Sequence, residues 1–252
     1  MITRALFLAL AAASFATAAC NAEKGPEGSA AASGSTAPVP APNGGDWTTV
    51  VAQTPEGGFL MGNPNAAVKL VEFGSMTCPH CAEFDETGAK PLIDNYVKTG
   101  RVAFEFRNYV RDPYDLAASL VARCGGAASF FGLTRGLFAE QRDWMQKIQS
   151  ADPQQMQAIQ ALPPSQQLGQ IANIAGFQQW AAMRGLPQEK SAACLSNQAE
   201  IDRLVQMTSD AGSTYNLPGT PSFLINGELV DIQPGSTVWS QVESKIKAAL
   251  GG

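Results

Sequence analysis

The sequence predicts an α/β protein into which an all-helical domain is inserted. The pattern over 47–112 is strand, helix and strand, and 199–252 shows helix, strand, strand and helix. Between them, 113–198 shows helical spacing of apolar residues and no strand signal. A Cys-Pro-His-Cys motif also follows directly on an apolar run of strand length. Together these observations predict one sheet whose chain is interrupted by a block of helices.

Composition limits what the chain does. Its 252 residues are enough for one domain with an insertion, and 45% of them are hydrophobic. The net charge is −5 and no basic run occurs, so we expect no nucleic-acid partner. No apolar stretch inside the chain is long enough to span a membrane.

Residues 1–19 have the pattern of a secretory signal peptide. Arg4 is their only charge, Leu6 to Phe15 form an apolar run, and small residues follow. A buried N-terminal helix is the alternative, but the run lacks the polar face that such a helix would expose. We therefore expect export to the periplasm.

Residues 20–46 are expected to form a disordered tether. They are mostly Ala, Gly, Ser, Pro and Glu, and therefore bury too little apolar surface to offset the entropy of ordering. Thr17–Cys20 resembles a bacterial lipobox, which makes Cys20 a candidate for lipid attachment and the tether a flexible link to the membrane. Cleavage without lipidation and a spacer without function are the alternatives.

The elements of the first folded part follow in order. Before the motif we expect a strand at 48–51, a turn at 54–58 and a strand at 67–73. After it we expect a helix over 79–96, kinked at Pro91, and a strand at 102–106.

The inserted block is predicted to be helical and rich in glutamine. Apolar residues recur at helical spacing in 116–121 and 130–138. In the glutamine-rich segment 146–170, Pro153 and Pro163–Pro164 break any long helix. After the block we expect a helix at 199–215, a strand at 222–225, a turn at Asn226–Gly227, a strand at 228–230 and a helix at 236–250.

The Cys78–Pro79–His80–Cys81 motif has the arrangement of a redox-active cysteine pair. Unpaired backbone N–H groups at a helix start stabilise an anion, so Cys78 is expected to ionise to the reactive thiolate. Pro79 suits the first turn because no N–H is needed there. Cys81, one turn on, can resolve a mixed disulfide, and His80 can add a donor or a charge for the thiolate.

Other uses of these cysteines fit the sequence less well. A cysteine hydrolase needs a histidine base facing the cysteine, but His80, the one histidine of the chain, lies on the same helix start. A closed zinc site needs four ligands, whereas Cys124 and Cys194 are single and distant. We expect no metal and no cofactor, because the dithiol itself carries the electrons.

The chain has five cysteines, and an odd number in an exported protein needs an explanation. One lipidated residue, one redox pair and one structural bridge between Cys124 and Cys194 would use all five. Such a bridge would close a loop of about 70 residues and contribute roughly 4 kcal/mol. Two separate buried thiols are the alternative.

Two segments resemble the DsbA-type family of thioredoxin-fold proteins. Val71–Cys81 is similar to the family's active-site segment, and Gly219–Gly227 is similar to its cis-proline loop with the hairpin that follows. The helical block matches the family's inserted helical domain, so the resemblance extends over 47–252. It implies a thioredoxin fold with an inserted all-helical domain.

The resemblance implies roles for individual residues. Cys78 would be the nucleophile and Cys81 the resolving thiol. The Thr220 backbone would pair with a bound peptide strand, beside a cis Pro221. Glu72 would be the buried acid beneath the cysteines, and an acid in an apolar strand has a raised pKa and can shuttle a proton. A solvated Glu72 and an ordinary trans Pro221 are the alternatives.

The family implies a protein-disulfide oxidoreductase. We expect a monomeric oxidase that donates the Cys78–Cys81 disulfide to reduced or misoxidised exported proteins and is reoxidised by a membrane redox partner. Thr220 favours a disulfide isomerase or reductase instead, because isomerases often have threonine before the cis-proline. A redox-inert client-binding module is the alternative of another class. Some members carry an extra disulfide in the helical domain, which supports the Cys124–Cys194 bridge.

Overall fold

The computed structural model describes residues 36–252, apart from the side chains of residues 164 and 165. The predicted signal peptide at 1–19 lies outside the described residues. So does Cys20, the candidate for lipid attachment.

The fold begins before the predicted end of the tether at residue 46. The Val39 N–H donates to the Thr99 carbonyl at 2.9 Å, and the Trp47 indole N–H donates to the Val39 carbonyl at 2.6 Å. Trp47 is buried, so its N–H needs an acceptor inside the fold. The Val39 carbonyl is that acceptor, so the chain before Trp47 is held against the fold. The prediction of disorder is therefore wrong for 39–46.

Six strands form one mixed sheet in the order β1-β2-β4-β3-β5-β6. They are β1 (Val51–Gln53), β2 (Phe59–Gly62), β3 (Val68–Gly74), β4 (Val102–Asn108), β5 (Ser222–Ile225) and β6 (Glu228–Leu229). β3 and β4 are parallel, and every other neighbouring pair is antiparallel. Helices are inserted between β4 and β5, which confirms the predicted fold class.

The start of the sheet differs from the prediction. Trp47–Thr49 form one helical turn instead of a strand, because the Asp46 carboxylate accepts the Thr48 N–H at 2.9 Å and caps the turn. β1 therefore begins at Val51. The sequence does not predict β2, because this short strand is almost entirely buried and shows no alternation.

The chain stays helical from the motif to Val97, with changes in winding instead of a single kink. α1 (Pro79–Phe84) and α2 (Lys90–Leu92) alternate with wider, π-type turns at Asp85–Ala89 and Ile93–Val97. The predicted kink residue, Pro91, lies in α2 and has no N–H to donate. Wider turns on both sides of it accommodate the missing bond.

The insertion consists of seven helices. They are α3 (Pro113–Arg123), α4 (Ala127–Ala139), α5 (Gln141–Gln149), α6 (Pro153–Gln160), α7 (Pro164–Ala175), α8 (Phe177–Ala182) and α9 (Gln188–Leu195). Two of the predicted helix breakers, Pro153 and Pro164, begin α6 and α7, where a missing N–H costs nothing. Between residues 36 and 252, no helix combines the length and the hydropathy needed to cross a bilayer.

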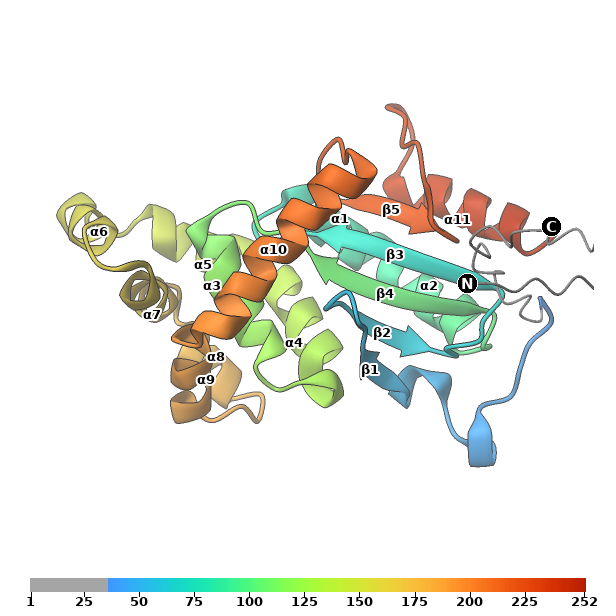
Figure 1. Ribbon diagram of the computed structural model, residues 1–252, viewed down its shortest axis with the longest axis horizontal. Coiled ribbons are helices and arrows are strands. Elements are labelled where there is room, and N and C mark those ends of the chain that lie inside the picture. Colours follow the sequence, from blue (N-terminus) through green and yellow to red (C-terminus); the bar gives the residue numbers. More distant parts are fainter. Residues whose placement is uncertain (1–35) are drawn as a thin grey trace, which may run out of the picture. The chain divides into compact units, whose positions relative to one another are not determined.

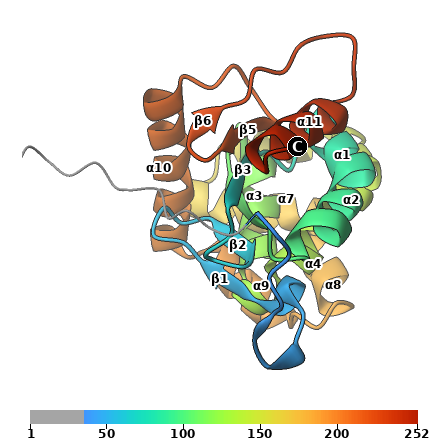
Figure 2. The ribbon, with the colours of Figure 1, turned by 90° about the vertical axis from the view of Figure 1, so that its right-hand side faces the viewer.

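Helices cover both faces of the sheet. α10 (Gln198–Tyr215) crosses one face, while α1, α2 and α11 (Val238–Ala249) lie along the other (Figures 1 and 2). Most of the insertion lies beyond the C-terminal end of β3 (Figure 1). Phe130 of α4 stacks on Phe59 of β2 with ring centroids 4.1 Å apart. The insertion and the sheet therefore share one core.

A disulfide between Cys124 and Cys194 joins the end of α3 to α9. Its partners are 70 residues apart, so its removal increases the freedom of the unfolded chain. We expect the variant Cys124→Ala/Cys194→Ala to lose about 4 kcal/mol of unfolding free energy. Urea denaturation measures the loss, with the other cysteines kept in one redox state. A loss below about 1 kcal/mol would mean that the bridge contributes little.

Candidate active site

Cys78 lies at the start of α1, directly after a tight turn. β3 ends at Gly74, and the Cys78 N–H donates to the Ser75 carbonyl at 3.1 Å, which closes the turn. Cys78 has extended backbone angles, φ −85° and ψ 119°, and Pro79 occupies the first helical position. The first N–H groups of α1 therefore face the Cys78 side chain. Both thiols of the motif are free and buried.

The surroundings of Cys78 stabilise its thiolate. A hydrogen bond from the Cys81 thiol has the largest effect, and the Thr220 side chain and the backbone N–H groups of Cys81 and His80 add to it. Desolvation raises the pKa of Cys78, but these hydrogen bonds outweigh it and lower the pKa from 9.0 to about 5. Because the thiolate is the nucleophilic form, Cys78 is the candidate for the reactive member of the pair.

Thr220 meets Cys78 with two different groups. In the reduced structure the Cys78 thiol donates to the Thr220 carbonyl at 3.0 Å, a bond that favours the protonated thiol. The Thr220 hydroxyl is buried and has no hydrogen-bond partner there. Loss of the proton removes the first bond, and the hydroxyl then stabilises the thiolate, which lowers the pKa of Cys78. The peptide bond between Thr220 and Pro221 is cis.

Cys81 lies deeper than Cys78 and is held as a thiol. It is fully buried, and its Sγ accepts the Ser75 N–H at 3.5 Å. Desolvation, the bond to Cys78 and the charge of Glu72 raise the pKa of Cys81 well above 9.0. The fold therefore separates the two thiols into one that ionises readily and one that keeps its proton.

Glu72 supplies a buried carboxyl near this pair. It lies in β3, is almost completely buried, and one of its oxygens has no hydrogen-bond partner. Desolvation, with smaller effects from the charges of Asp85 and Cys78, raises the pKa of Glu72 well above 4.5 and favours its neutral form. The burial excludes a solvated carboxylate. A neutral acid there can supply a proton to Cys81 when its sulfur leaves as a thiolate.

Glu72→Leu is expected to stabilise the fold, and by more at higher pH. A carboxyl whose folded pKa is raised destabilises the native state as the pH climbs above the unfolded value, by about 1.4 kcal/mol per unit until the folded pKa is reached. Urea denaturation at about pH 5 and about pH 8 measures the gain.

Glu105→Leu on the neighbouring β4 is the matched control. Glu105 is also buried, but it accepts bonds from Arg107 at 2.8 and 2.9 Å, so its loss should destabilise the protein. A Glu72→Leu variant that is destabilised at both pH values would contradict the assignment of Glu72 as a buried carboxyl that costs stability.

Asp85 adds a second acid close to Glu72, and sequence reasoning missed it. Burial raises the pKa of Asp85 to about 6, although Arg135 of α4, whose Nε lies 3.4 Å from the carboxylate, lowers it. Its side chain is 17% exposed, so it lies nearer to solvent than Glu72. A single acid within a helix carries no pattern that predicts this position.

Two residues of the insertion bind the turn that precedes Cys78, and sequence reasoning missed both. The Asp115 carboxylate on α3 accepts the Ser75 hydroxyl at 2.5 Å and the Met76 N–H at 2.8 Å. The Gln141 amide on α5 donates to the carbonyls of Met76 at 2.7 Å and Cys78 at 2.9 Å. The helical insertion therefore contacts the backbone of Cys78 itself.

His80 extends into solvent instead of covering Cys78. Its side chain is 71% exposed, and its Nδ1 lies 3.5 Å from the Glu83 carboxylate. The expectation that the imidazole adds a donor or a charge for the thiolate thus has no support, because the imidazole contacts Glu83 and not Cys78. The backbone N–H of His80 is the group that stabilises Cys78.

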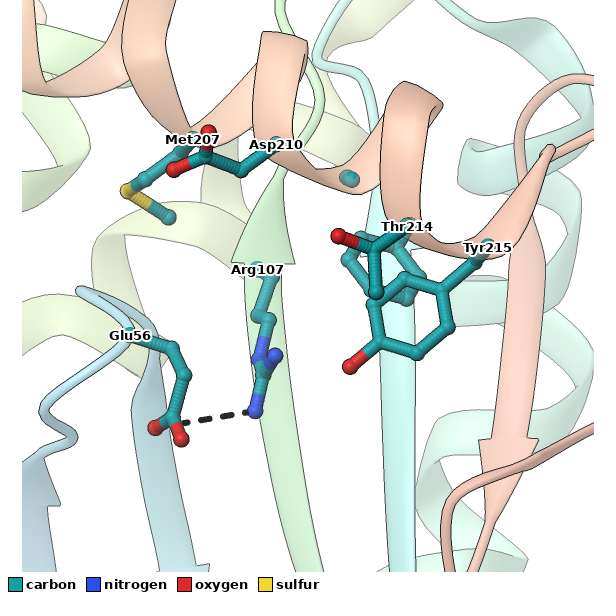
Figure 3. A pocket seen from close by; sticks show the side chains of 8 residues that line it. Glu56, Arg107, Met207, Asp210, Thr214 and Tyr215 are labelled. Carbon is teal, nitrogen blue, oxygen red and sulfur yellow. Dashed lines mark ion pairs between the residues drawn. The ribbon is translucent and has the colours of Figure 1, made fainter.

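A cavity of about 170 Å³ lies between α10 and the sheet (Figure 3), and no cysteine lines it. Arg107 lines it and is held by Glu105, and its Nη2 lies 3.7 Å from the Glu56 carboxylate. Because these acids balance its charge, we do not assign Arg107 to the candidate site. In the part of the chain that the structure describes, no group of His, Cys, Asp and Glu side chains is arranged to hold a metal.

Comparison with known proteins relates this fold to characterised structures. A thioredoxin family model matches residues 54–247. A protein-disulfide isomerase of Novosphingobium aromaticivorans, of known structure, is 34% identical and has a TM-score of 0.70, over 77% of this chain and 97% of that one. The structure of alpha-DsbA1 of Wolbachia pipientis has a TM-score of 0.60 at 21% identity, over 79% of this chain and 94% of that one, and so shares the fold.

A sequence relative in Rickettsia felis carries the provisional name protein-disulfide oxidoreductase. It is 26% identical over 193 residues, which are 76% of this chain and 60% of the relative. This chain therefore spans about 60% of the length of that relative. The family model covers most of the described residues and includes the Cys78–Cys81 pair, and it shows that this chain belongs to the DsbA-like family of thioredoxin-fold proteins.

Proposed function

We propose that this protein is a thiol:disulfide oxidoreductase that acts as an oxidase and donates the Cys78–Cys81 disulfide to reduced proteins. The observation that carries the proposal is the lowering of the pKa of Cys78 to about 5. A stabilised thiolate stabilises the reduced enzyme, and the disulfide is then given up readily. The name of the Rickettsia relative supports the same chemistry.

The proposed reaction moves two electrons from a substrate dithiol to the enzyme. A substrate thiolate attacks the Sγ of Cys78, the Cys78–Cys81 bond breaks, and Cys81 takes a proton for which Glu72 is the proposed donor. The second substrate thiolate then attacks the substrate sulfur of the mixed disulfide and releases Cys78 as a thiolate. The products are a substrate disulfide and the enzyme dithiol.

The proposed substrates are reduced or misoxidised exported proteins. An extended substrate strand would pair with the backbone of Thr220, beside Pro221, and bring its thiolate to Cys78. The enzyme would act as a monomer, and a membrane redox partner would reoxidise it after each cycle.

Export is the part of the proposal that rests on the sequence alone. Residues 1–19 would direct the chain to the periplasm, and Cys20 would carry the lipid that anchors it through the segment before Val39. Mass spectrometry of the mature N-terminus from membrane extracts tests this assignment. We expect a lipidated Cys20, and an unmodified N-terminus would remove the anchor.

The reduction potential of the Cys78–Cys81 pair tests the direction of electron flow. The full chain is equilibrated in glutathione buffers, and peptide mapping counts the two motif thiols apart from Cys124 and Cys194. We expect a reduction potential of about −120 mV, as in strong oxidants. A reduction potential of about −270 mV would mean that the pair acts as a reductant.

A disulfide isomerase is the second candidate. Thr220 before Pro221 favours it, and so does the name of the Novosphingobium relative. An isomerase starts from the reduced form, in which the Cys78 thiolate attacks a wrong substrate disulfide. If the reduced protein restores native pairing in a scrambled substrate without added oxidant, the isomerase is favoured. Stoichiometric oxidation of a reduced substrate favours the oxidase.

A further inference from the structure

We propose that Gln141 is a positioning residue through which the helical insertion controls the reactivity of Cys78. The inference rests on the proposed thiol:disulfide chemistry and names a further residue that sets it. Gln141 begins α5, and its side chain is buried. Its amide nitrogen donates to the Met76 carbonyl at 2.7 Å and to the Cys78 carbonyl at 2.9 Å. Both amide hydrogens are thus used on the turn before α1.

Met76 shows why the turn depends on the insertion. Met76 is fully buried, so its backbone groups need partners within the protein. Its N–H donates to Asp115 of α3, and its carbonyl accepts from Gln141 of α5. Both partners belong to the insertion, whereas β3 and α1 supply neither.

Asp112 and Arg111 bind side chains of the turn and do not reach Cys78. The Thr77 hydroxyl donates to the Asp112 carboxylate at 2.7 Å. The Arg111 guanidinium donates to the hydroxyls of Ser75 at 2.9 Å and Thr77 at 3.1 Å. Among the insertion residues that bind this turn, Gln141 is the one bonded to the backbone of the nucleophile.

Loss of the Gln141 amide would change how α1 begins. The Cys78 carbonyl would keep the Ala82 N–H at 3.2 Å, but the Met76 carbonyl would be buried without a donor. Since an unpaired buried carbonyl is costly, the turn would shift to recover a partner. The backbone N–H groups of His80 and Cys81 would then lose their alignment with the Cys78 sulfur. The thiolate would become less stable, and the disulfide less oxidising.

The test is a pH titration of Cys78 in the reduced, full-length variant Gln141→Met, followed by the ultraviolet absorbance of the thiolate. Methionine matches glutamine in length but donates no hydrogen bond. The same variant with Cys78→Ser supplies the baseline for the other thiols. We expect the pKa of Cys78 to rise by about one unit or more, and the equilibrium constant for disulfide exchange with glutathione to change about tenfold toward the enzyme disulfide.

Gln149→Met is the matched control, because Gln149 lies on the exposed face of the same helix and should leave the titration unchanged. A wild-type pKa in folded Gln141→Met overturns the proposal and assigns Gln141 a structural role only. If Gln141→Met does not fold, Gln141→Asn replaces it, since its neutral amide is one methylene shorter and adds no charge that would shift the titration. An upward shift of the titration then supports the proposal, and an unshifted one overturns it.

The outcome is independent of the direction of electron flow, because the titration uses no substrate. A strongly negative reduction potential of the wild type would overturn the proposed oxidase. In that case the difference in Cys78 pKa between wild type and the Gln141 variant would still test the role of Gln141.

Discussion

Replacement of Cys78 by serine is expected to abolish disulfide transfer, with a fall in rate on the order of a thousandfold or more. Cys78 is the thiol whose pKa is lowered to about 5, so its sulfur is the one that ionises in the reduced protein as the pH rises above that value. A serine hydroxyl neither ionises near neutral pH nor forms a disulfide. The measurement is the rate at which the oxidised protein forms a disulfide in a reduced two-cysteine peptide.

Cys81→Ser separates the roles of the two thiols. This variant keeps Cys78 beside the Thr220 carbonyl but lacks the resolving thiol. The mixed disulfide that forms when its Cys78 thiolate attacks a disulfide-bonded substrate and releases one substrate thiolate should therefore persist on non-reducing gels. His80→Ala should slow transfer far less than Cys78→Ser, because its imidazole is exposed and paired with Glu83. If a variant with both motif cysteines replaced by serine assisted client folding as well as wild type, the protein would be a redox-inert binding module.

The central part of the fold could be predicted because its signals are local. β3 is a buried apolar run, and its predicted and observed limits differ by one residue at each end. Asn226 and Gly227 have positive φ angles of 51° and 89°, a conformation that these residue types favour in a tight hairpin. The cap at Asp46 is equally local, but the β-branched residues after it resemble a strand and conceal it.

Less of the candidate site could be predicted, because its supporting contacts are long-range. Cys78 and Cys81 are visible as a motif, whereas Asp115 and Gln141 reach Met76 across 39 and 65 residues. No local pattern shows which polar side chain of a helix faces a distant turn.

Gln141 does carry a weak signal of its own. It shares one helical face with Trp144 and Ile148, and both of these residues are buried. A glutamine on an apolar stripe is expected to be buried and bonded. The exposed glutamines around it conceal this signal, so composition alone favours a solvated segment.

The reduced protein is expected to gain stability relative to the oxidised protein as the pH rises from about 5 to about 9. Folding lowers the pKa of Cys78 from 9.0 to about 5. An acid whose folded pKa is depressed contributes stability that is complete above the unfolded value and is lost as the pH falls through the folded value. At about pH 7 the contribution is on the order of 3 kcal/mol in the reduced protein. The oxidised protein lacks it, because its Cys78 has no thiol to ionise.

Comparing the two redox forms separates Cys78 from the other buried acids. Burial raises the pKa values of Glu72, Asp85 and Asp115, which lowers stability as the pH rises, but these groups are present in both forms. The Cys78–Cys81 bond restricts the unfolded chain by an amount that does not depend on pH. Urea denaturation of both forms between about pH 5 and about pH 9 gives the difference, and reduced Cys78→Ser should run parallel to the oxidised wild type. A difference that stays constant with pH would show that folding leaves Cys78 with an ordinary pKa, and the oxidase proposal would lose the observation that carries it.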